Sequence, residues 1–403
     1  MAALCIRPDR PWLAPLAGYS NLPFRLLCRE LGAAAACTEM VSAKGIYYSL
    51  YPHASGACAA GSWPGQDAAL DGSPPEATDW LEEGQAGRPT LPAPLPSLAE
   101  INARKGKGTW ALLASPETDT PLIVQLFGAE PDTVRKAAEV VLQVFAGREI
   151  YFDLNMGCAV PKVVRTGSGA ALLTDPDRAV KVAKALLDAT GPGRAGFKLR
   201  LGWQNGEDVY LELARRLQDA GAAWVTLHPR YGRQGFGGRA DWGRLALLKK
   251  ALDIPVVASG DLLSAAAAKD CLEQSGADAV MFARGAMHNP FIFKQFRQLM
   301  AGGQVQWPEP GALLEAILRH AGLARFWLDE RYALSQMRGF IPRYVHHVPG
   351  VRALRQQLTA CRTWEQLEII ISQLAQHCRE TGAFQTPEPE GRSRMNRHSA
   401  TGD

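Results

Sequence analysis

The sequence predicts an α/β fold, a (β/α)8 TIM barrel followed by a small C-terminal all-helical bundle domain. Three observations predict it. Short apolar runs alternate with helical stretches over most of the first 310 residues, which is typical of parallel strands. Eight such units can be counted, the number that closes this barrel. After about Gly311 the pattern is wholly helical. The alternative is an open doubly wound sheet, but no Gly-x-Gly-x-x-Gly motif follows the first strand.

Each expected strand is a short apolar run that glycine, proline or a polar cluster ends. The expected strands are 12–17, 34–40, 122–127, 150–154, 196–200, 224–228, 254–258 and 277–282. The helices expected between them are 23–31, 42–50, 131–145, 175–189, 206–220, 242–252 and 264–274, with another starting at 289–290. The predicted bundle has helices at 313–332, 333–345, 351–360 and 363–381.

The chain divides into a barrel domain (1–310), a helical domain (311–383) and a tail (384–403). Within the barrel domain, 52–108 is rich in Gly, Pro, Ala and Ser and has no clear period. We interpret it as a mostly irregular surface insertion, with a helical turn at 79–85. The tail is rich in Pro, Glu, Arg and Ser, which predicts disorder.

Composition excludes several classes of protein. The net charge of +4 is mild for 403 residues, so the overall balance does not by itself indicate nucleic acid. The eight cysteines are scattered, with no Cys-x-x-Cys pair, which indicates reduced thiols and no metal site. The N-terminus lacks the apolar core of a signal peptide, and no run is long enough to span a bilayer. We expect a cytoplasmic protein without membrane contact, and no obligate protein partner is evident.

In a barrel of this kind the active site is built from the loops that follow the strands. These positions carry Pro15, Leu16, Ala17, Glu39, Gln125, Asn155, Cys158, Lys198, Arg200, His228, Arg230, Ser259, Gly260, Asp261, Ala283, Arg284 and Gly285. Cations and amide donors dominate, which suits an anionic ligand. The last two loops commonly bind phosphate. A phosphate tail and a polar ring edge together describe a flavin.

Each of these residues also has a structural explanation. Lys198 or Arg200 could neutralise Glu39, His228 could be a buried core histidine, and Cys158 could be a small apolar filler. Without a shared ligand, a separate structural explanation is needed for the polar residue at almost every strand end. One ligand site accounts for all of them together.

Six motifs carry a resemblance to a known family. They are Leu13–Gly18, Asp153–Cys158, Lys198–Gly202, His228–Arg230, Ser259–Asp261 and Ala283–Gly285, in this order. The set resembles the tRNA-dihydrouridine synthases, FMN-dependent enzymes that reduce uridines in tRNA with NADPH or, less commonly, NADH. The match covers about 11–50 and 120–300. The eight arginines between Arg319 and Arg362 resemble the family's helical tRNA-binding domain, although a solvated helix face would also carry such a run.

The resemblance implies a role for each matching residue. Cys158 would be the proton donor, and Asn155 and Arg200 would meet the target uracil. The residues that would hold FMN are Pro15, Leu16, Ala17, Gln125, Lys198, His228, Ser259, Gly260, Asp261, Ala283 and Arg284. A hydride would reach C6 of uracil and a proton C5, with Arg200 stabilising the enolate charge. Free thiols are mostly protonated near neutral pH, which suits an acid. The base must be splayed out of the RNA.

Two residues depart from the family pattern. Ala159 replaces the usual proline after Cys158, which frees one φ angle beside the thiol. Ser259 replaces an asparagine, so one side-chain amide is missing. Two other functions stay open: another FMN-dependent barrel oxidoreductase acting on a small pyrimidine or enone, and a non-catalytic RNA-binding barrel. The arginine-rich helices argue against the first, and Cys158 with Lys198 against the second.

Overall fold

Eight parallel strands close into a barrel in the computed structural model, which describes residues 4–50, 95–105 and 108–381. The strands are β1 (Trp12–Leu13), β2 (Ala35–Cys37), β4 (Leu122–Phe127), β5 (Ile150–Met156), β6 (Ala195–Arg200), β7 (Trp224–His228), β8 (Val256–Ala258) and β9 (Ala279–Phe282). Pairing of β1 with both β2 and β9, and of β2 with β4, closes the ring. The predicted barrel is confirmed. The short β3 (Val41–Ser42), which pairs with β4, was not predicted.

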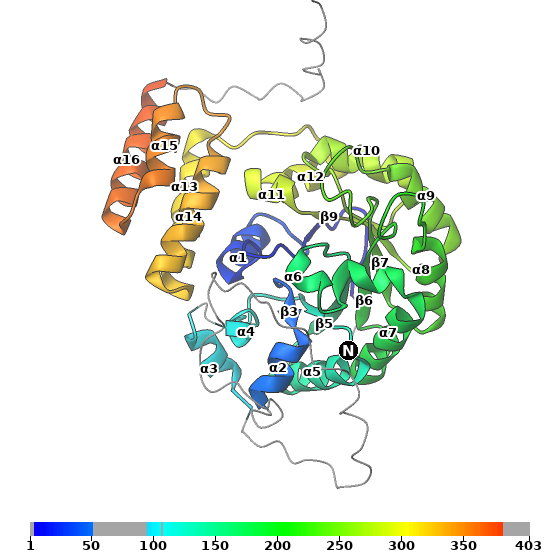
Figure 1. The fold of residues 1–403 in the computed structure, drawn as a ribbon. Helices are drawn as coiled ribbons and strands as arrows, with labels where there is room; N and C mark the ends of the chain where they lie inside the picture. Colours follow the sequence, from blue (N-terminus) through cyan, green and yellow to red (C-terminus); the bar gives the residue numbers. More distant parts are fainter. Residues whose placement is uncertain (1–3, 51–94, 106–107, 382–403) are drawn as a thin grey trace, which may run out of the picture.

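Helices surround the barrel (Figure 1). The outer ring contains α1 (Leu22–Glu30), α2 (Ala43–Leu50), α5 (Pro131–Val144), α7 (Pro176–Thr190), α8 (Tyr210–Asp219), α9 (Trp242–Ala251), α10 (Ala265–Ser275) and α12 (Ile292–Met300). Shorter segments are α3 (Leu98–Ala103), α4 (Gly108–Ala111), α6 (Pro161–Val164), α11 (Arg284–His288) and the 3-10 helix 169–174. Several starts are capped as their sequences predict: Asn21, Asp175 and Ser264 each accept a hydrogen bond from a backbone N–H of the first turn.

The N-terminal half of the barrel interior is filled by aromatic side chains. Trp12 and Trp224 meet edge to face with 5.7 Å between their ring centroids, and Tyr151 packs beside Trp224. Gly196 makes room for this cluster, because a Cβ there would lie 2.0 Å from the indole of Trp224. With this end plugged by apolar groups, a ligand must enter from the C-terminal ends of the strands.

The C-terminal bundle lies against one side of the barrel (Figure 1). It consists of α13 (Pro310–Trp327), α14 (Glu330–Tyr344), α15 (Arg352–Ala360) and α16 (Trp364–Thr381). Its helix α13 packs on α1, and α14 contacts α11. Phe24 and Phe340 stack with centroids 4.6 Å apart, and the Arg319–Glu30 ion pair bridges the two parts. Within the described residues, no helix combines the length and apolarity that crossing a membrane requires.

Several predicted elements differ in the structure. The strand expected at 12–17 is only Trp12–Leu13, and instead of one helix starting at 289–290, α11 begins at Arg284 and α12 at Ile292. The part of the expected irregular insertion that is described contains α3, which begins with a capping box formed by Ser97 and Glu100. The helix expected from 206 begins at Tyr210. The first bundle helix ends at Trp327 rather than 332, because Asp329 caps a new helix there. The turn expected at 79–85 and the tail 384–403 lie outside the described residues.

Candidate active site at the barrel mouth

The residues predicted at the strand ends converge at the C-terminal mouth of the barrel. Alternation along the strands turns Gln125, Asn155, Lys198, Arg200 and His228 inward, because the residues before and after each of them pack against the helices. The register aligns Asn155 with Lys198, and Arg200 with His228. The other predicted positions lie in the loops after β1, β8 and β9 and are Pro15, Leu16, Ala17, Ser259, Gly260, Asp261, Ala283 and Arg284.

A chain of side-chain hydrogen bonds runs up the inside of the barrel from Asp153. The Nε2 of Gln125 donates to Oδ2 of Asp153 at 2.5 Å, and its Oε1 accepts from Nδ2 of Asn155 at 2.9 Å. The Oδ1 of Asn155 then accepts from the backbone N–H groups of Gly157 and Cys158, at 3.1 and 2.9 Å. When Asp153 is ionised it only accepts hydrogen bonds, and it then fixes which end of the Gln125 and Asn155 amides faces the Cys158 loop. We call this chain the amide relay.

The amide relay leaves Asn155 without a free hydrogen-bonding group. Its second N–H contacts Sδ of Met40 at 3.0 Å, so both donors and both acceptor positions are engaged. These bonds let Asn155 hold the loop that carries Cys158, and the contact of Asn155 with a substrate stays a prediction. Gln125 keeps one N–H beyond its bond to Asp153.

The loop that carries Cys158 is also held on its far side. The carbonyl of Cys158 accepts from the N–H of Ala170 at 2.8 Å. Gly169 allows this approach, since its φ is +64° and a Cβ there would lie 2.5 Å from that carbonyl oxygen. Cys158 is partly exposed at the mouth, and all seven cysteines in the described ranges are free thiols.

Arg200 joins the Cys158 loop to the loop after β7. Its Nε donates to the carbonyl of Gly157 at 2.8 Å, and its Nη1 donates to the carbonyls of Tyr231 and Gly235. Its Nη2 has no acceptor among the residues that the structure describes, so two N–H groups remain for a ligand. Burial and the nearby Arg230 lower the pKa of Arg200 to about 10, which leaves it charged at neutral pH. Neither Arg200 nor Lys198 pairs with Glu39, which accepts from the N–H of Gly18 instead.

Lys198 is a half-buried cation on the inner face of the barrel. No hydrogen bond or ion pair links its ammonium to any described residue, although Asp153 lies near enough to act on its charge. Burial and the neighbouring Arg200 lower the pKa of Lys198. Burial raises the pKa of Asp153, against the hydrogen bond from Gln125 and the charge of Lys198. The interior therefore favours an additional anion or polar acceptor beside Lys198.

His228 is neutral, and its tautomer follows from its neighbour. Burial, with Lys198, Arg200 and two further arginines nearby, lowers its pKa far below the usual range. Nη1 of Arg230 lies 3.2 Å from its Nε2, and an arginine can only donate. The ring proton therefore sits on Nδ1, where it can be donated to a ligand. His228 is buried, as the structural explanation required, but it still presents a donor.

Asp261 forms ion pairs with two arginines, Arg230 after β7 and Arg284 after β9. Its carboxylate accepts two bonds from Arg230, at 2.9 and 2.7 Å, and one from Arg284 at 2.9 Å. Burial opposes ionisation, but these bonds outweigh it and lower the pKa of Asp261. The residue has a φ of +56°, and Gly260 before it has +103°. A Cβ at Gly260 would lie 2.6 Å from the ring of His228, so this loop needs glycine.

The loop after β7 contributes a residue that the sequence did not single out. Phe236 is 61% exposed, yet its ring lies 4.5 Å from the guanidinium carbon of Arg284 and 6.0 Å from that of Arg200. Its ring centroid is 6.1 Å from that of His228. An exposed aromatic side chain within a glycine-rich segment, Gly235–Gly238, was the available signal.

Comparison with known proteins shows the family of the chain. The family model of dihydrouridine synthase (Dus) matches residues 12–54 and 99–379. A probable tRNA-dihydrouridine synthase of Treponema pallidum is 35% identical over 64% of this chain and 77% of its own length. A probable tRNA-dihydrouridine synthase of Aquifex aeolicus is 26% identical over 88% of this chain and 92% of its own length.

A third relative, probable tRNA-dihydrouridine synthase 1 of Synechocystis, is 38% identical over 60% of this chain and 66% of its own length. The family model matches well over half of the chain and covers both the barrel and the helical bundle. The chain therefore belongs to the dihydrouridine synthase (Dus) family.

Proposed function

We propose that this chain is an FMN-dependent tRNA-dihydrouridine synthase, which reduces the C5–C6 double bond of uridine in tRNA with NADPH or NADH. The observation that carries the proposal is a thiol, Cys158, held at the barrel mouth beside the cations Lys198 and Arg200. Family membership supports the same reaction, which the names of the relatives describe.

The residues at the mouth fit FMN, which has an anionic phosphate and a ring edge rich in nitrogen and oxygen. Lys198 forms no ion pair or hydrogen bond with a described residue, and His228 offers its Nδ1 proton. Gly260 keeps the space beside His228 free of a Cβ. The proposed FMN-binding residues are Pro15, Leu16, Ala17, Gln125, Lys198, His228, Ser259, Gly260, Asp261, Ala283 and Arg284. Asp261 acts by holding Arg284 in place.

Three residues of the site have distinct tasks in the proposed reaction. Bound FMN, once reduced, supplies the hydride that uracil C6 needs. Cys158 donates the proton to C5, from a loop whose backbone the amide relay holds. The two N–H groups on Nη2 of Arg200 stabilise the negative charge that develops on the uracil carbonyl. Asn155 acts indirectly, by fixing the backbone beside the thiol.

Exposed arginines on the bundle favour RNA as the substrate. Arg331, Arg352 and Arg362 are exposed and form no ion pair with the described residues. Such guanidinium groups bind phosphates, and binding then weakens as salt rises. The thiol lies inside the barrel mouth, so the target base must leave the RNA stack to reach it.

The test begins with the purified protein and FMN. We expect a yellow protein that oxidises NADPH and forms dihydrouridine in tRNA lacking that modification. Cys158→Ala should retain the flavin and lose about a hundredfold or more of dihydrouridine formation, the usual contribution of a positioned acid. Cys5→Ala, which removes an exposed thiol elsewhere, is the matched control.

Failure to bind FMN under reconstitution would contradict the proposed cofactor. Normal activity of Cys158→Ala would remove the acid role while leaving the reaction in place.

A further inference from the structure

A second hollow lies beside the barrel mouth, between the loops that follow β6 and β7. It has a volume of about 470 Å³, within the range of pockets that hold small molecules or single nucleotides. Leu201, Pro229 and Tyr231 provide its apolar lining. Asn205 and Gln234 place amide groups at its edge. None of the proposed FMN or uracil contacts belongs to it.

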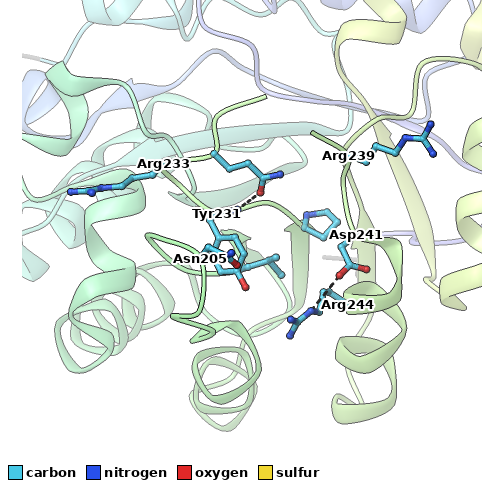
Figure 2. Close-up of a pocket in the computed structure, with 9 residues that line it drawn as sticks. Asn205, Tyr231, Arg233, Arg239, Asp241 and Arg244 are labelled. Atoms are coloured by element: carbon cyan, nitrogen blue, oxygen red, sulfur yellow. Dashed lines mark hydrogen bonds and ion pairs between the residues drawn. The ribbon is translucent and has the colours of Figure 1, made fainter. Parts of the chain in front are cut away.

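Two arginines at the pocket have no counter-charge within the described part of the chain. Figure 2 shows Arg233 and Arg239 at opposite ends of the opening, with their guanidinium groups extending away from each other. Neither forms an ion pair with a described residue; Arg233 lies over the ring of Trp203. The third arginine, Arg244, is neutralised by Asp208 and Asp241.

This layout favours a chain of phosphates over a single anion. A free phosphate cannot reach two guanidinium groups that diverge from opposite ends of an opening. A polynucleotide passing across the opening can place one phosphate at each end. Between them, the apolar lining suits the face of a base. The amide of Asn205 has no hydrogen bond to a described residue and offers both a donor and an acceptor to a base edge.

The pocket shares a wall with the proposed active site. Tyr231 lines the pocket, and its backbone carbonyl accepts from Nη1 of Arg200 at 2.9 Å. Its hydroxyl donates to Asp208 at 2.5 Å, which fixes the ring. A ligand in the pocket would therefore lie one residue away from the cation assigned to the target uracil.

We propose that this pocket binds a nucleotide that flanks the target uridine, with its base in the hollow and its phosphates at Arg233 and Arg239. The inference rests on the proposed function, because a base splayed into the barrel mouth requires its neighbours to lie on the rim. Contacts to flanking nucleotides set the sequence context of other enzymes that act on splayed bases. The pocket thus contributes to the preference for the nucleotide beside the modified uridine.

The test compares two double variants that each remove two positive charges. Arg233→Ala/Arg239→Ala changes the pocket, whereas Lys181→Ala/Lys184→Ala changes exposed lysines of α7 on the outer ring. Both are assayed as FMN-loaded full-length protein with tRNA transcripts in which the nucleotides flanking the modified uridine are varied. The pocket variant should lower the slope of log affinity against log salt by about 0.7 for each phosphate that no longer meets a guanidinium group. It should keep wild-type FMN content and NADPH oxidation.

Asn205→Ala gives a second, independent measurement. It should reduce the preference for one flanking base and leave the salt slope unchanged, since it removes no charge. Equal slopes for the two double variants would overturn the proposal. So would a raised KM for NADPH with unchanged tRNA binding, which would assign the arginines to the phosphates of the reductant. If the wild-type protein forms no dihydrouridine in any transcript, the proposed function fails, and the salt slopes still report whether the pocket binds RNA.

Discussion

Replacing Asp153 by asparagine tests whether the amide relay orients the thiol of Cys158, the proposed proton donor. Asp153 is 1% exposed and touches neither the thiol nor the proposed substrate contacts. Its carboxylate accepts from the NH2 group of Gln125, so the oxygen of Gln125 faces Asn155. Asn155 then donates to that oxygen and turns its own oxygen toward the loop. An asparagine has the same shape but does not fix the orientation of the Gln125 amide, because either end of the asparagine amide can face Gln125.

The magnitude follows from the bonds involved. A hydrogen bond to a charged group contributes about 1.5–3 kcal/mol, and one between neutral groups about 0.5–1.5 kcal/mol. If the new amide in Asp153→Asn turns its oxygen toward Gln125, its NH2 group takes the place of Oδ1. In the wild type, Oδ1 has no hydrogen-bond partner among the described residues, and Asp153 lies near Lys198. The NH2 group would therefore lie near a cation without an acceptor. We expect the loop conformation that places Cys158 at the substrate to be destabilised by about 1.4 kcal/mol, which lowers the rate of dihydrouridine formation about tenfold.

The assay separates the two halves of the reaction. Reduction of the bound flavin by NADPH, followed by its absorbance, should stay within about twofold of wild type, because Asp153 lies below the loop and not in it. Reoxidation by tRNA, which in the proposed mechanism takes its proton from Cys158, should slow about tenfold. Thr226→Val is the matched control. It removes a buried hydroxyl on the nearby strand β7, and this hydroxyl has no hydrogen-bond partner within the described ranges. Wild-type reoxidation in Asp153→Asn would refute the reasoning, and loss of flavin would make Asp153 a structural residue only.

Two further substitutions test the framework of the site. Asp119→Asn should cost about 3–5 kcal/mol in urea unfolding, because it leaves two buried arginines of α1 without their charge partner. Burial opposes ionisation of Asp119, but the arginines outweigh it and lower its pKa, so its stabilisation is present above about pH 4 and lost below; the variant should show a flatter acid limb. Gly260→Ala should lower FMN affinity, because its Cβ would lie 2.6 Å from the ring of His228. Gly206→Ala, also at positive φ but with no atom within 4 Å, should retain it.

Much of the barrel could be predicted because its signals are local. Apolar runs such as Leu122–Phe127 end in polar or glycine residues, and the number of such runs alone limits the topology. The residues at the strand ends could be predicted from the same runs, because each run ends where its loop begins. The Ser97–Glu100 capping box is also a local signal for a helix, but the Gly- and Pro-rich sequence around it favours an irregular segment. Asp329 is likewise a local cap signal, and it lies within the helix expected at 313–332.

The arrangement within the site could not be predicted in the same way. Which end of the Gln125 amide faces Asp153 depends on two strands meeting in register. The contacts of Asp261 with Arg230 and Arg284 join residues from three loops. Sequence shows that such groups lie at strand ends, but it does not show which of them neutralise one another. That Asp261 takes the arginines, while Lys198 has no ion pair with a described residue, is a property of the folded loops.

The structure also decides what Ala159 means for the thiol. A proline there would limit the unfolded chain and contribute about 0.4–1 kcal/mol, which this chain lacks. Four hydrogen bonds hold the same loop: Asn155 accepts from two of its N–H groups, Arg200 donates to Gly157, and Ala170 donates to Cys158. At about 0.5–1.5 kcal/mol each, any two of them match the missing proline. The loop is therefore fixed by its contacts, and weakening the amide relay should disturb the thiol more than the alanine does.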